Sequence, residues 1–254
     1  MRGGAQAHMM RADDGHFYVV KFQNNPQHLR VLANEFLATR LAERVGLPVP
    51  KAEIVEVGEW LIANTSDLRL ELAGSSQPCA PGLQFGSRFA VNPFEGQLFD
   101  YLPESHLGRV RNLGAFAGML AFDKWSCNAN GRQAAYWRLP RQKRYTVSFI
   151  DQGYCFNAGE WSFPDASLRG VYAYNAVYSE VRGWQSFVPW IERIESLGAE
   201  DIGEIASAIP PEWYGHAAAD LERLIEELVA RRGKVRDLIS DFRRSSRNPF
   251  PNWS

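Results

Sequence analysis

Residues 121–156, AFDKWSCNANGRQAAYWRLPRQKRYTVSFIDQGYCF, contain the polar side chains from which the rest of the chain can be interpreted. Asn128 follows Asp123 by five positions, and Asp151 comes directly after the apolar run 146–150. Mg²⁺ prefers oxygen ligands and is usually held by one or two carboxylates together with nucleotide phosphates. Two aspartates and an amide meet that requirement, so the stretch predicts a site for Mg²⁺ with nucleotide phosphates. The alternative is that these residues cap turns in ordinary loops.

A second group of polar residues lies nearer to the N-terminus. Residues 17–22, FYVVKF, predict a β-strand from their aromatic and β-branched content, and Lys21 lies among these apolar neighbours. Residues 29–45 have apolar side chains at helical spacing, with Glu35 on the flank of the apolar stripe. A lysine in an apolar strand needs a partner, so we expect an ion pair between Lys21 and Glu35. The alternative is that Glu35 is a solvated helix charge.

The first residues of the chain are small and rich in glycine. Gly3, Gly4, Ala5 and Gln6 lead into a predicted hairpin whose turn is at 13–15. Glycines beside a hairpin strand allow backbone N–H groups to approach phosphate oxygens closely. The chain contains neither a Walker A pattern nor a dinucleotide-binding glycine fingerprint.

Composition limits the class of protein. The 254 residues are 45% hydrophobic and 22% charged, which is enough to build a core as one large domain or two lobes. The net charge of -1 gives no electrostatic reason to expect direct nucleic-acid binding or an anionic membrane as a partner. Neither a signal peptide nor a membrane-length apolar run of about 20 residues is present. We therefore expect a cytoplasmic protein, with its three cysteines as reduced thiols.

The order of predicted elements divides the chain into two parts. Residues 54–57 and 60–63 are expected to be strands, 74–81 a loop, and 83–91 an extended segment between two lobes. Helical spacing begins near residue 105 and leads to Asp123. A final long helix is expected over residues 217–242, and the many aromatic residues of 154–190 are expected to pack in the core. The predicted fold class is α+β, with a β-rich lobe over residues 1–92 and a helical lobe over 93–254.

Several motifs in this order resemble those of the HipA-like kinases, which are bacterial serine/threonine kinases with a two-lobed protein-kinase-like fold. Some members of that family are toxins of toxin–antitoxin pairs. The Ile-Asp-x-Gly element also looks like that of the more distant phosphoinositide kinases. The motifs that carry the resemblance are Gly4-Ala5-Gln6, Lys21, Asn34-Glu35, Gly46-Leu47-Pro48-Val49-Pro50, Asp123 with Asn128, and Ile150-Asp151-Gln152-Gly153.

The resemblance implies a role for each matching residue. The loop from Gly3 to Gln6 would cover the phosphates of ATP, and Lys21 would contact them while paired with Glu35. Asp123 would receive or orient the acceptor hydroxyl, while Asn128 and Asp151 would hold Mg²⁺. The implied partners are a protein substrate and, as for some relatives, an antitoxin.

The chain also departs from ordinary protein kinases. Ala121-Phe122 stands where those enzymes have His-Arg, and Gln152 replaces the phenylalanine of their metal-binding triplet. Two alternatives therefore remain open from the sequence. One is a kinase of small molecules or lipid head groups, and the other is a catalytically inactive pseudokinase that acts as a binding module.

Overall fold

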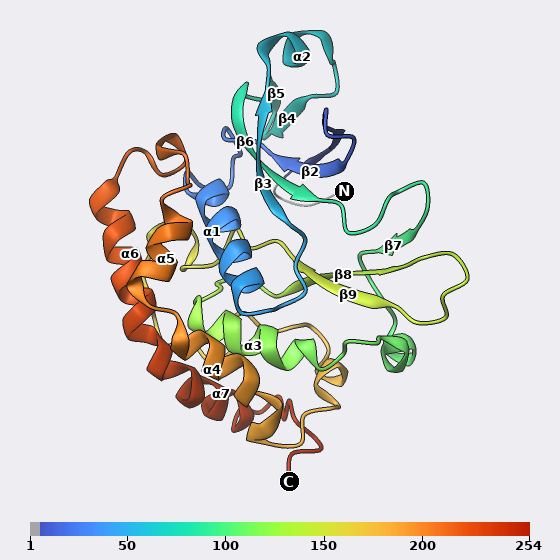
Figure 1. The fold of residues 1–254 in the computed structure, drawn as a ribbon, viewed down its shortest axis with the longest axis vertical. Helices are drawn as coiled ribbons and strands as arrows, with labels where there is room; N and C mark the ends of the chain where they lie inside the picture. The colour runs from blue at the N-terminus through green and yellow to red at the C-terminus, as the bar shows by residue number, and fades with distance from the viewer. Residues whose placement is uncertain (1–5) are drawn as a thin grey trace.

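The N-terminal part of the chain forms an antiparallel sheet. The computed structural model describes residues 6–254. The sheet has four strands in the order β1-β2-β6-β3 (Figure 1), and these are β1 His8–Arg11, β2 Phe17–Lys21, β6 Gly82–Arg88 and β3 Ala52–Val57. Lys21 lies opposite Phe85 in the register of β2 and β6. The predicted hairpin is therefore present, with Lys21 at the end of its second strand.

Helix α1 (Val31–Arg44) lies between this sheet and the remaining helices (Figure 1). It contacts β3 and β6 on one side and α5 (Ala199–Ala206) on the other. Most of its residues are buried, including Asn34 and Glu35. The helix ends before Gly46, whose φ of +80° is a conformation that favours glycine.

Two predictions for the N-terminal part were wrong. Residues 60–63 are not a strand but lie in helix α2 (Glu59–Asn64), and residues 74–81 are not only a loop because β5 (Ser75–Pro78) pairs with β4 (Arg69–Leu72). An apolar run of four residues does not separate helix from strand, and a two-residue turn ending in Gly74, with φ of +82°, is enough to close a hairpin. The segment 83–91 is mostly the paired strand β6.

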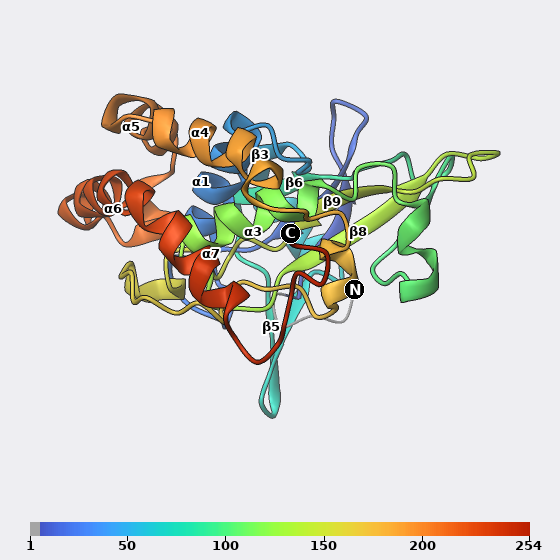
Figure 2. The same cartoon turned by 90° about the horizontal axis from the view of Figure 1, so that it is seen from below.

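The second part of the chain combines a small sheet with a helical layer (Figures 1 and 2). Its sheet has the order β7-β8-β9, with β7 Gln97–Phe99, β8 Gln133–Arg138 and β9 Thr146–Ile150. Its other α-helices are α3 Ala115–Trp125, α4 Val188–Ser196, α6 Ala218–Arg231 and α7 Val235–Arg243. Short 3-10 helices connect them: η1 Glu104–Arg109, η2 Ala158–Glu160, η3 Asn175–Tyr178, η4 Trp184–Ser186, η5 Pro211–Tyr214 and η6 Arg232–Lys234.

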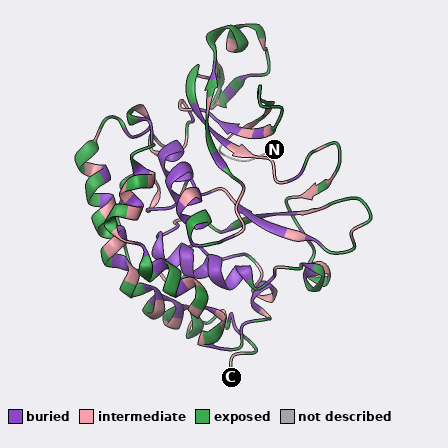
Figure 3. Ribbon diagram, in the orientation of Figure 1, coloured by how far each residue is buried: buried purple, intermediate pink, exposed green. Residues whose placement is uncertain are grey.

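Helix α3 lies at the centre of the core, and every one of its residues is buried (Figure 3). Gly118 packs against the indole of Trp190, where an added Cβ would come within 2.4 Å of the ring. The aromatic residues of 154–190 pack as expected, with Phe187 and Tyr178 both contacting Phe250. Among the described residues, no helix is long and apolar enough to cross a membrane.

Candidate active site

Three charged side chains from distant parts of the chain meet where β2, α1 and β9 converge. The Lys21 ammonium donates to Glu35 Oε1 and, at 2.7 Å, to Asp151 Oδ1. The ion pair between Lys21 and Glu35 that the sequence predicts is therefore present, and Asp151 joins it. Lys21 and Glu35 are almost fully buried, while the Asp151 side chain keeps 19% of its surface exposed.

The electrostatics of this trio keep the lysine charged. Burial alone would lower the pKa of Lys21, but the carboxylates of Glu35 and Asp151 outweigh it and raise that pKa above its ordinary value. Burial opposes ionisation of Asp151 too, yet the Lys21 ammonium holds the pKa of Asp151 below its ordinary value. Burial raises the pKa of Glu35, and Lys21 opposes that rise. The result is a cation held at the end of a strand with a carboxylate beside it.

The loop after β9 is fixed to helix α1 by two adjacent side chains. Glu35 accepts hydrogen bonds from the backbone N–H groups of Gln152 (3.0 Å) and Gly153 (2.8 Å). The Asn34 amide donates to the carbonyl oxygens of Gly153, Cys155 and Ala158 at 2.9, 2.9 and 2.7 Å. Asp151 itself has a φ of 63°, a conformation that aspartate and asparagine tolerate better than most residues. The motif Asn34-Glu35 thus sets the position of the Asp151 loop.

The trio lies on the wall of a cavity between the four-stranded sheet and the β8–β9 hairpin. Val19, Phe85, Phe149 and other apolar residues line one part of it, and Lys21, Glu35, Asp151 and Gln133 line the other. Apolar walls with a few convergent polar groups are typical of ligand sites. The volume is about 170 Å³, less than the roughly 300–1,000 Å³ usual for such sites. The cavity itself therefore holds only part of a nucleotide.

Asp123 is not among the residues that line this cavity. Its carboxylate is fully enclosed and is held by the guanidinium of Arg132, with Arg132 Nε donating to Oδ2 at 2.9 Å. Arg132 also donates to the carbonyl oxygens of Ile150 (2.9 Å) and Asp151 (3.3 Å). Asp123 is therefore connected to the Asp151 loop through Arg132. Contact with an acceptor hydroxyl would require Arg132 to release the carboxylate.

Asn128 belongs to the same enclosed group. Its amide nitrogen donates to Asp123 Oδ1 at 3.0 Å, and its amide oxygen accepts from the backbone N–H of Asn130 at 3.0 Å. Gly170 covers both side chains, since an added Cβ there would lie 2.7 Å from the Cβ of Asp123 and 3.2 Å from that of Asn128. The structure thus brings Lys21, Glu35 and Asp151 together, and it places Asp123 and Asn128 in a second cluster.

Sequence reasoning missed Gln133 as a candidate. This first residue of β8 lies opposite Ile150 in the hairpin register, and its amide donates to Asp151 Oδ2 at 2.6 Å. A signal was present, because a residue at the start of one hairpin strand lies beside the end of the other. The predicted phosphate-contacting residues Gly3, Gly4 and Ala5 lie outside the described residues. Gln6 lines the cavity and donates to the Glu71 carbonyl at 2.6 Å.

The chemistry of the cavity fits a nucleotide with a divalent cation. In the described part of the chain no three His, Cys, Asp or Glu side chains are grouped as a complete metal site. Mg²⁺ does not need such a group, because phosphate and water oxygens complete its coordination. The Asp151 carboxylate supplies oxygens on one side, where the Gln133 amide donates to it, and Lys21 supplies a positive charge for phosphate.

Solved structures with similar folds are kinases. A Helicobacter pylori proinflammatory kinase, CtkA, is 14% identical with a TM-score of 0.51, and the match covers 93% of this chain and 92% of that one. Shewanella oneidensis HipA, solved with HipB and operator DNA, is 14% identical with a TM-score of 0.56, covering 97% and 67%. A Golgi casein kinase with Mn and ADP bound is 11% identical with a TM-score of 0.51, covering 97% and 72%. The fold is therefore kinase-like.

The family assignment comes from the sequence itself. Among proteins with curated descriptions, none matches the chain significantly. The model of the HipA-like kinase family matches residues 1–135, which is more than half of the chain and includes Lys21, Glu35 and Asp123. The chain belongs to the family of HipA-like kinases.

Proposed function

We propose that this protein transfers the γ-phosphoryl group of ATP, with Mg²⁺, to a serine or threonine hydroxyl of a bacterial protein. The observation that carries the proposal is the position of Lys21, which contacts Glu35 and Asp151 at once on the wall of a cavity. Phosphoryl transfer requires mainly positioning and charge neutralisation, and this trio supplies both.

Each residue of the cavity has a part in this proposal. Lys21, kept cationic by its two carboxylates, binds phosphate oxygens. Asp151 would hold the metal ion, and Gln133, whose amide donates to that carboxylate, would orient it; the ion would neutralise charge on the transferring phosphoryl group. The apolar wall that includes Val19 and Phe85 takes the base and excludes water from it.

The enclosed cluster has a positioning role in the same proposal. Asp123 fixes Arg132, and Arg132 holds the carbonyl oxygens of Ile150 and Asp151. This chain of contacts sets the backbone from which the Asp151 carboxylate projects. The direct role in orienting the acceptor hydroxyl, expected for Asp123 from the sequence, stays a prediction that requires its pair with Arg132 to open. Binding of the ion by Asn128, expected from the sequence, stays a prediction that requires the enclosed cluster to open.

The test is phosphoryl transfer from labelled ATP with Mg²⁺ to proteins of a bacterial lysate. Asp151→Asn keeps the shape and the backbone conformation of the residue and removes its charge, so transfer should fall by about a thousandfold or more. Asp67→Asn, at an exposed position that does not line the cavity, is the matched control and should leave transfer unchanged. Equal label on acceptors with wild type and Asp151→Asn would contradict the proposal. Label found only on small molecules would show that the acceptor is a small molecule and not a protein.

We extend the proposal to a partner of antitoxin type, because the family match is to HipA-like kinases and the Shewanella HipA structure contains HipB. Overproduction of the wild type in a bacterial host should arrest growth, while Asp151→Asn should not. Growth arrest by both the wild type and Asp151→Asn would show that the toxicity does not depend on phosphoryl transfer.

A further inference from the structure

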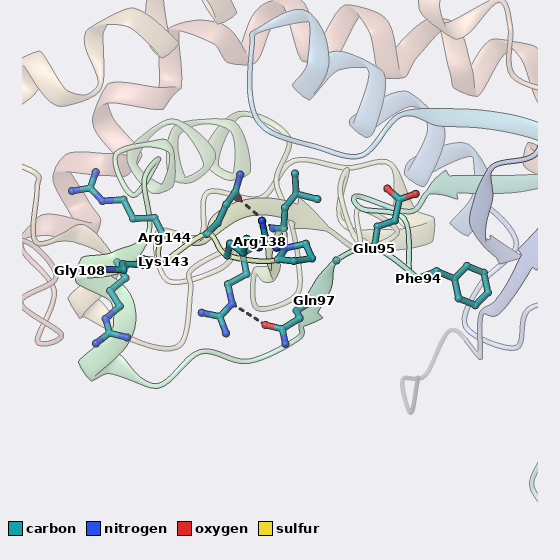
Figure 4. A pocket seen from close by; sticks show the side chains of 13 residues that line it. Phe94, Glu95, Gln97, Gly108, Arg138, Lys143 and Arg144 are labelled. Atoms are coloured by element: carbon teal, nitrogen blue, oxygen red, sulfur yellow. Dashed lines mark hydrogen bonds between the residues drawn. The ribbon is translucent and has the colours of Figure 1, made fainter.

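A second hollow lies at the outer part of the β8–β9 hairpin, away from the trio of charges. Its volume is about 1000 Å³. Its walls are the hairpin tip at 138–144, residues 94–97, which end at the first residue of β7, and residues 108–109 at the end of η1. The hairpin extends away from the helical layer (Figures 1 and 2). We call this hollow the hairpin groove, and Figure 4 shows it from close by.

The hairpin groove has a strong excess of positive charge. Its lining includes five cationic side chains, Arg109, Arg138, Arg141, Lys143 and Arg144. The acidic residue in the lining is Glu95, which lies beside Phe94 and at the other end of the view from Lys143 and Arg144 (Figure 4). In the part of the chain that the structure describes, none of the five cations forms an ion pair, whereas arginines elsewhere, such as Arg30 and Arg132, do. The whole protein has a net charge of only -1, so the positive charge of the groove is a local feature of this surface.

The walls of the hairpin groove are held in place by hydrogen bonds that leave most of these charges exposed. The backbone N–H of Tyr145 donates to the Arg109 carbonyl, and the N–H of Arg111 donates to the Tyr145 carbonyl, both at 2.9 Å. Arg138 Nε donates to the Gln97 amide oxygen at 2.8 Å (Figure 4), and its guanidinium lies 5.0 Å from the centre of the Tyr145 ring. These contacts fix the base of the hairpin against η1 and β7.

We propose that the hairpin groove docks an acidic segment, rich in Asp and Glu, of the protein that this kinase phosphorylates. Guanidinium groups match carboxylates in geometry as well as in charge. Apolar side chains also line the groove: Leu139, which is 39% exposed, follows Arg138 in the chain, and Phe94, which is 84% exposed, lies at the end beside Glu95. An exposed phenylalanine contributes to a peptide interface and is not needed to follow a phosphate backbone.

The size of the cluster also favours a peptide over duplex DNA. The affinity of a protein for duplex DNA comes largely from phosphate contacts, and a protein that makes about 6–10 of them depends strongly on salt. The hairpin groove offers five cations and includes the carboxylate of Glu95. A short acidic segment needs no more than this.

The inference rests on the proposed function, because it names the acceptor class of the same enzyme. Strand β8 joins the two places, with Arg138 at one end and Gln133 at the other. At the usual rise of a strand these residues lie about 17 Å apart, which about five extended residues of a bound chain would span. The docked segment and the acceptor hydroxyl would therefore be separate stretches of the same partner.

The test measures binding without ATP, so that it does not depend on phosphoryl transfer. The probe is a fluorescein-labelled peptide of ten glutamates, followed by anisotropy at low salt, with a peptide of ten glutamines as its neutral counterpart. The variant Arg141→Gln/Lys143→Gln/Arg144→Gln should weaken glutamate-peptide binding about tenfold or more. The control Arg40→Gln/Arg223→Gln/Arg244→Gln removes the same charge from exposed, ion-paired sites and should bind like the wild type.

The outcomes separate the groove from the kinase activity. Equal binding of the glutamate peptide by the two triple variants, or no binding by the wild type, would contradict the proposal that the groove docks an acidic segment. The proposal would also be contradicted if the groove bound a 20-base-pair DNA duplex more tightly than it binds the glutamate peptide. Groove-dependent peptide binding in a protein that transfers no phosphoryl group would support the docking site and contradict the proposed function instead.

Discussion

Two charged clusters lie on either side of the Asp151 loop, and they differ in what they face. Lys21, Glu35 and Asp151 line a cavity, and the Asp151 side chain keeps part of its surface exposed. Asp123 and Arg132 are enclosed, with side chains 0% and 2% exposed. Both clusters pair carboxylates with a cation, so composition does not separate them. Access to the cavity separates them: under the proposed function the first cluster binds the ligand and the second positions the Asp151 loop.

The largest effect should come from breaking the enclosed cluster. Asp123→Ala leaves the buried guanidinium of Arg132 without its carboxylate, so we expect the free energy of unfolding to fall by about 3–5 kcal/mol. Urea unfolding measures this. The double variant Asp123→Leu/Arg132→Met removes both charges and should recover a large part of the loss. A stable Asp123→Ala protein that has lost phosphoryl transfer would instead give Asp123 a direct role in catalysis.

Two buried lysines, one in each region, allow the same comparison to be made through the pH dependence of stability. Burial lowers the pKa of Lys124 from its ordinary value of 10.5 to about 8, although Asp123 opposes this shift. Its ammonium contacts the Arg169 carbonyl at 2.5 Å and lies 5.1 Å from the centre of the Phe242 ring. Lys21, with its carboxylates, has a raised pKa. One lysine is therefore disfavoured in its charged form by folding, and the other is favoured.

These opposite shifts predict opposite pH dependences. Between pH 8 and 10.5 the unfolded chain binds more protons at Lys124 than the folded protein does, so folding becomes more favourable as pH rises. Relative to Lys124→Met, the wild type should gain up to about 3 kcal/mol over that range. For Lys21 the folded pKa is the higher one, so its contribution is complete below pH 10.5 and is lost above it.

The measurement is the difference in unfolding free energy between wild type and each variant, Lys124→Met and Lys21→Met, at several pH values. Groups common to both proteins cancel in the difference. A difference for Lys124→Met that stays constant from pH 7 to 10.5 would show that this lysine is not desolvated as its burial implies.

The sequence could predict the Lys21–Glu35 pair, and Asp151 at the end of a strand, because each follows a local rule. It did not predict that Asp151 contacts Lys21. Alternation in the strand and the flank of a helix bring Lys21 and Glu35 together, and an apolar strand delivers Asp151 to its end. The same reasoning failed to show that Asp123 is enclosed, since Asp-x-x-x-x-Asn reads alike on a helix or in a loop. A signal lay in residues 115–125, which apart from Asp123 and Lys124 are apolar on all sides of the helix, as in a fully buried helix. The helix α2 and the hairpin of β4 and β5 were missed because short runs carry little periodicity.

The smallest expected effects concern the amide side chains of Gln133 and Asn128, which should respond differently to substitution. Gln133 lines the cavity beside Asp151, whereas Asn128 uses its amide within the enclosed cluster. Gln133→Ala should weaken Mg²⁺-dependent nucleotide binding by about tenfold, which corresponds to about 1.4 kcal/mol, with little change in stability. Asn128→Ala should leave that affinity unchanged and lower the free energy of unfolding by about 1–3 kcal/mol, because a hydrogen-bond partner of Asp123 is lost.

Calorimetric titration of ATP with and without Mg²⁺, together with urea unfolding, measures both quantities for both amide variants. If Asn128→Ala loses Mg²⁺-dependent affinity and Gln133→Ala does not, the enclosed cluster must open during binding. The loop that holds Asn128 would then turn towards the cavity, and Arg132 would have to release Asp123. The boundary between the two clusters would in that case describe one conformation of the enzyme and not a fixed division of roles.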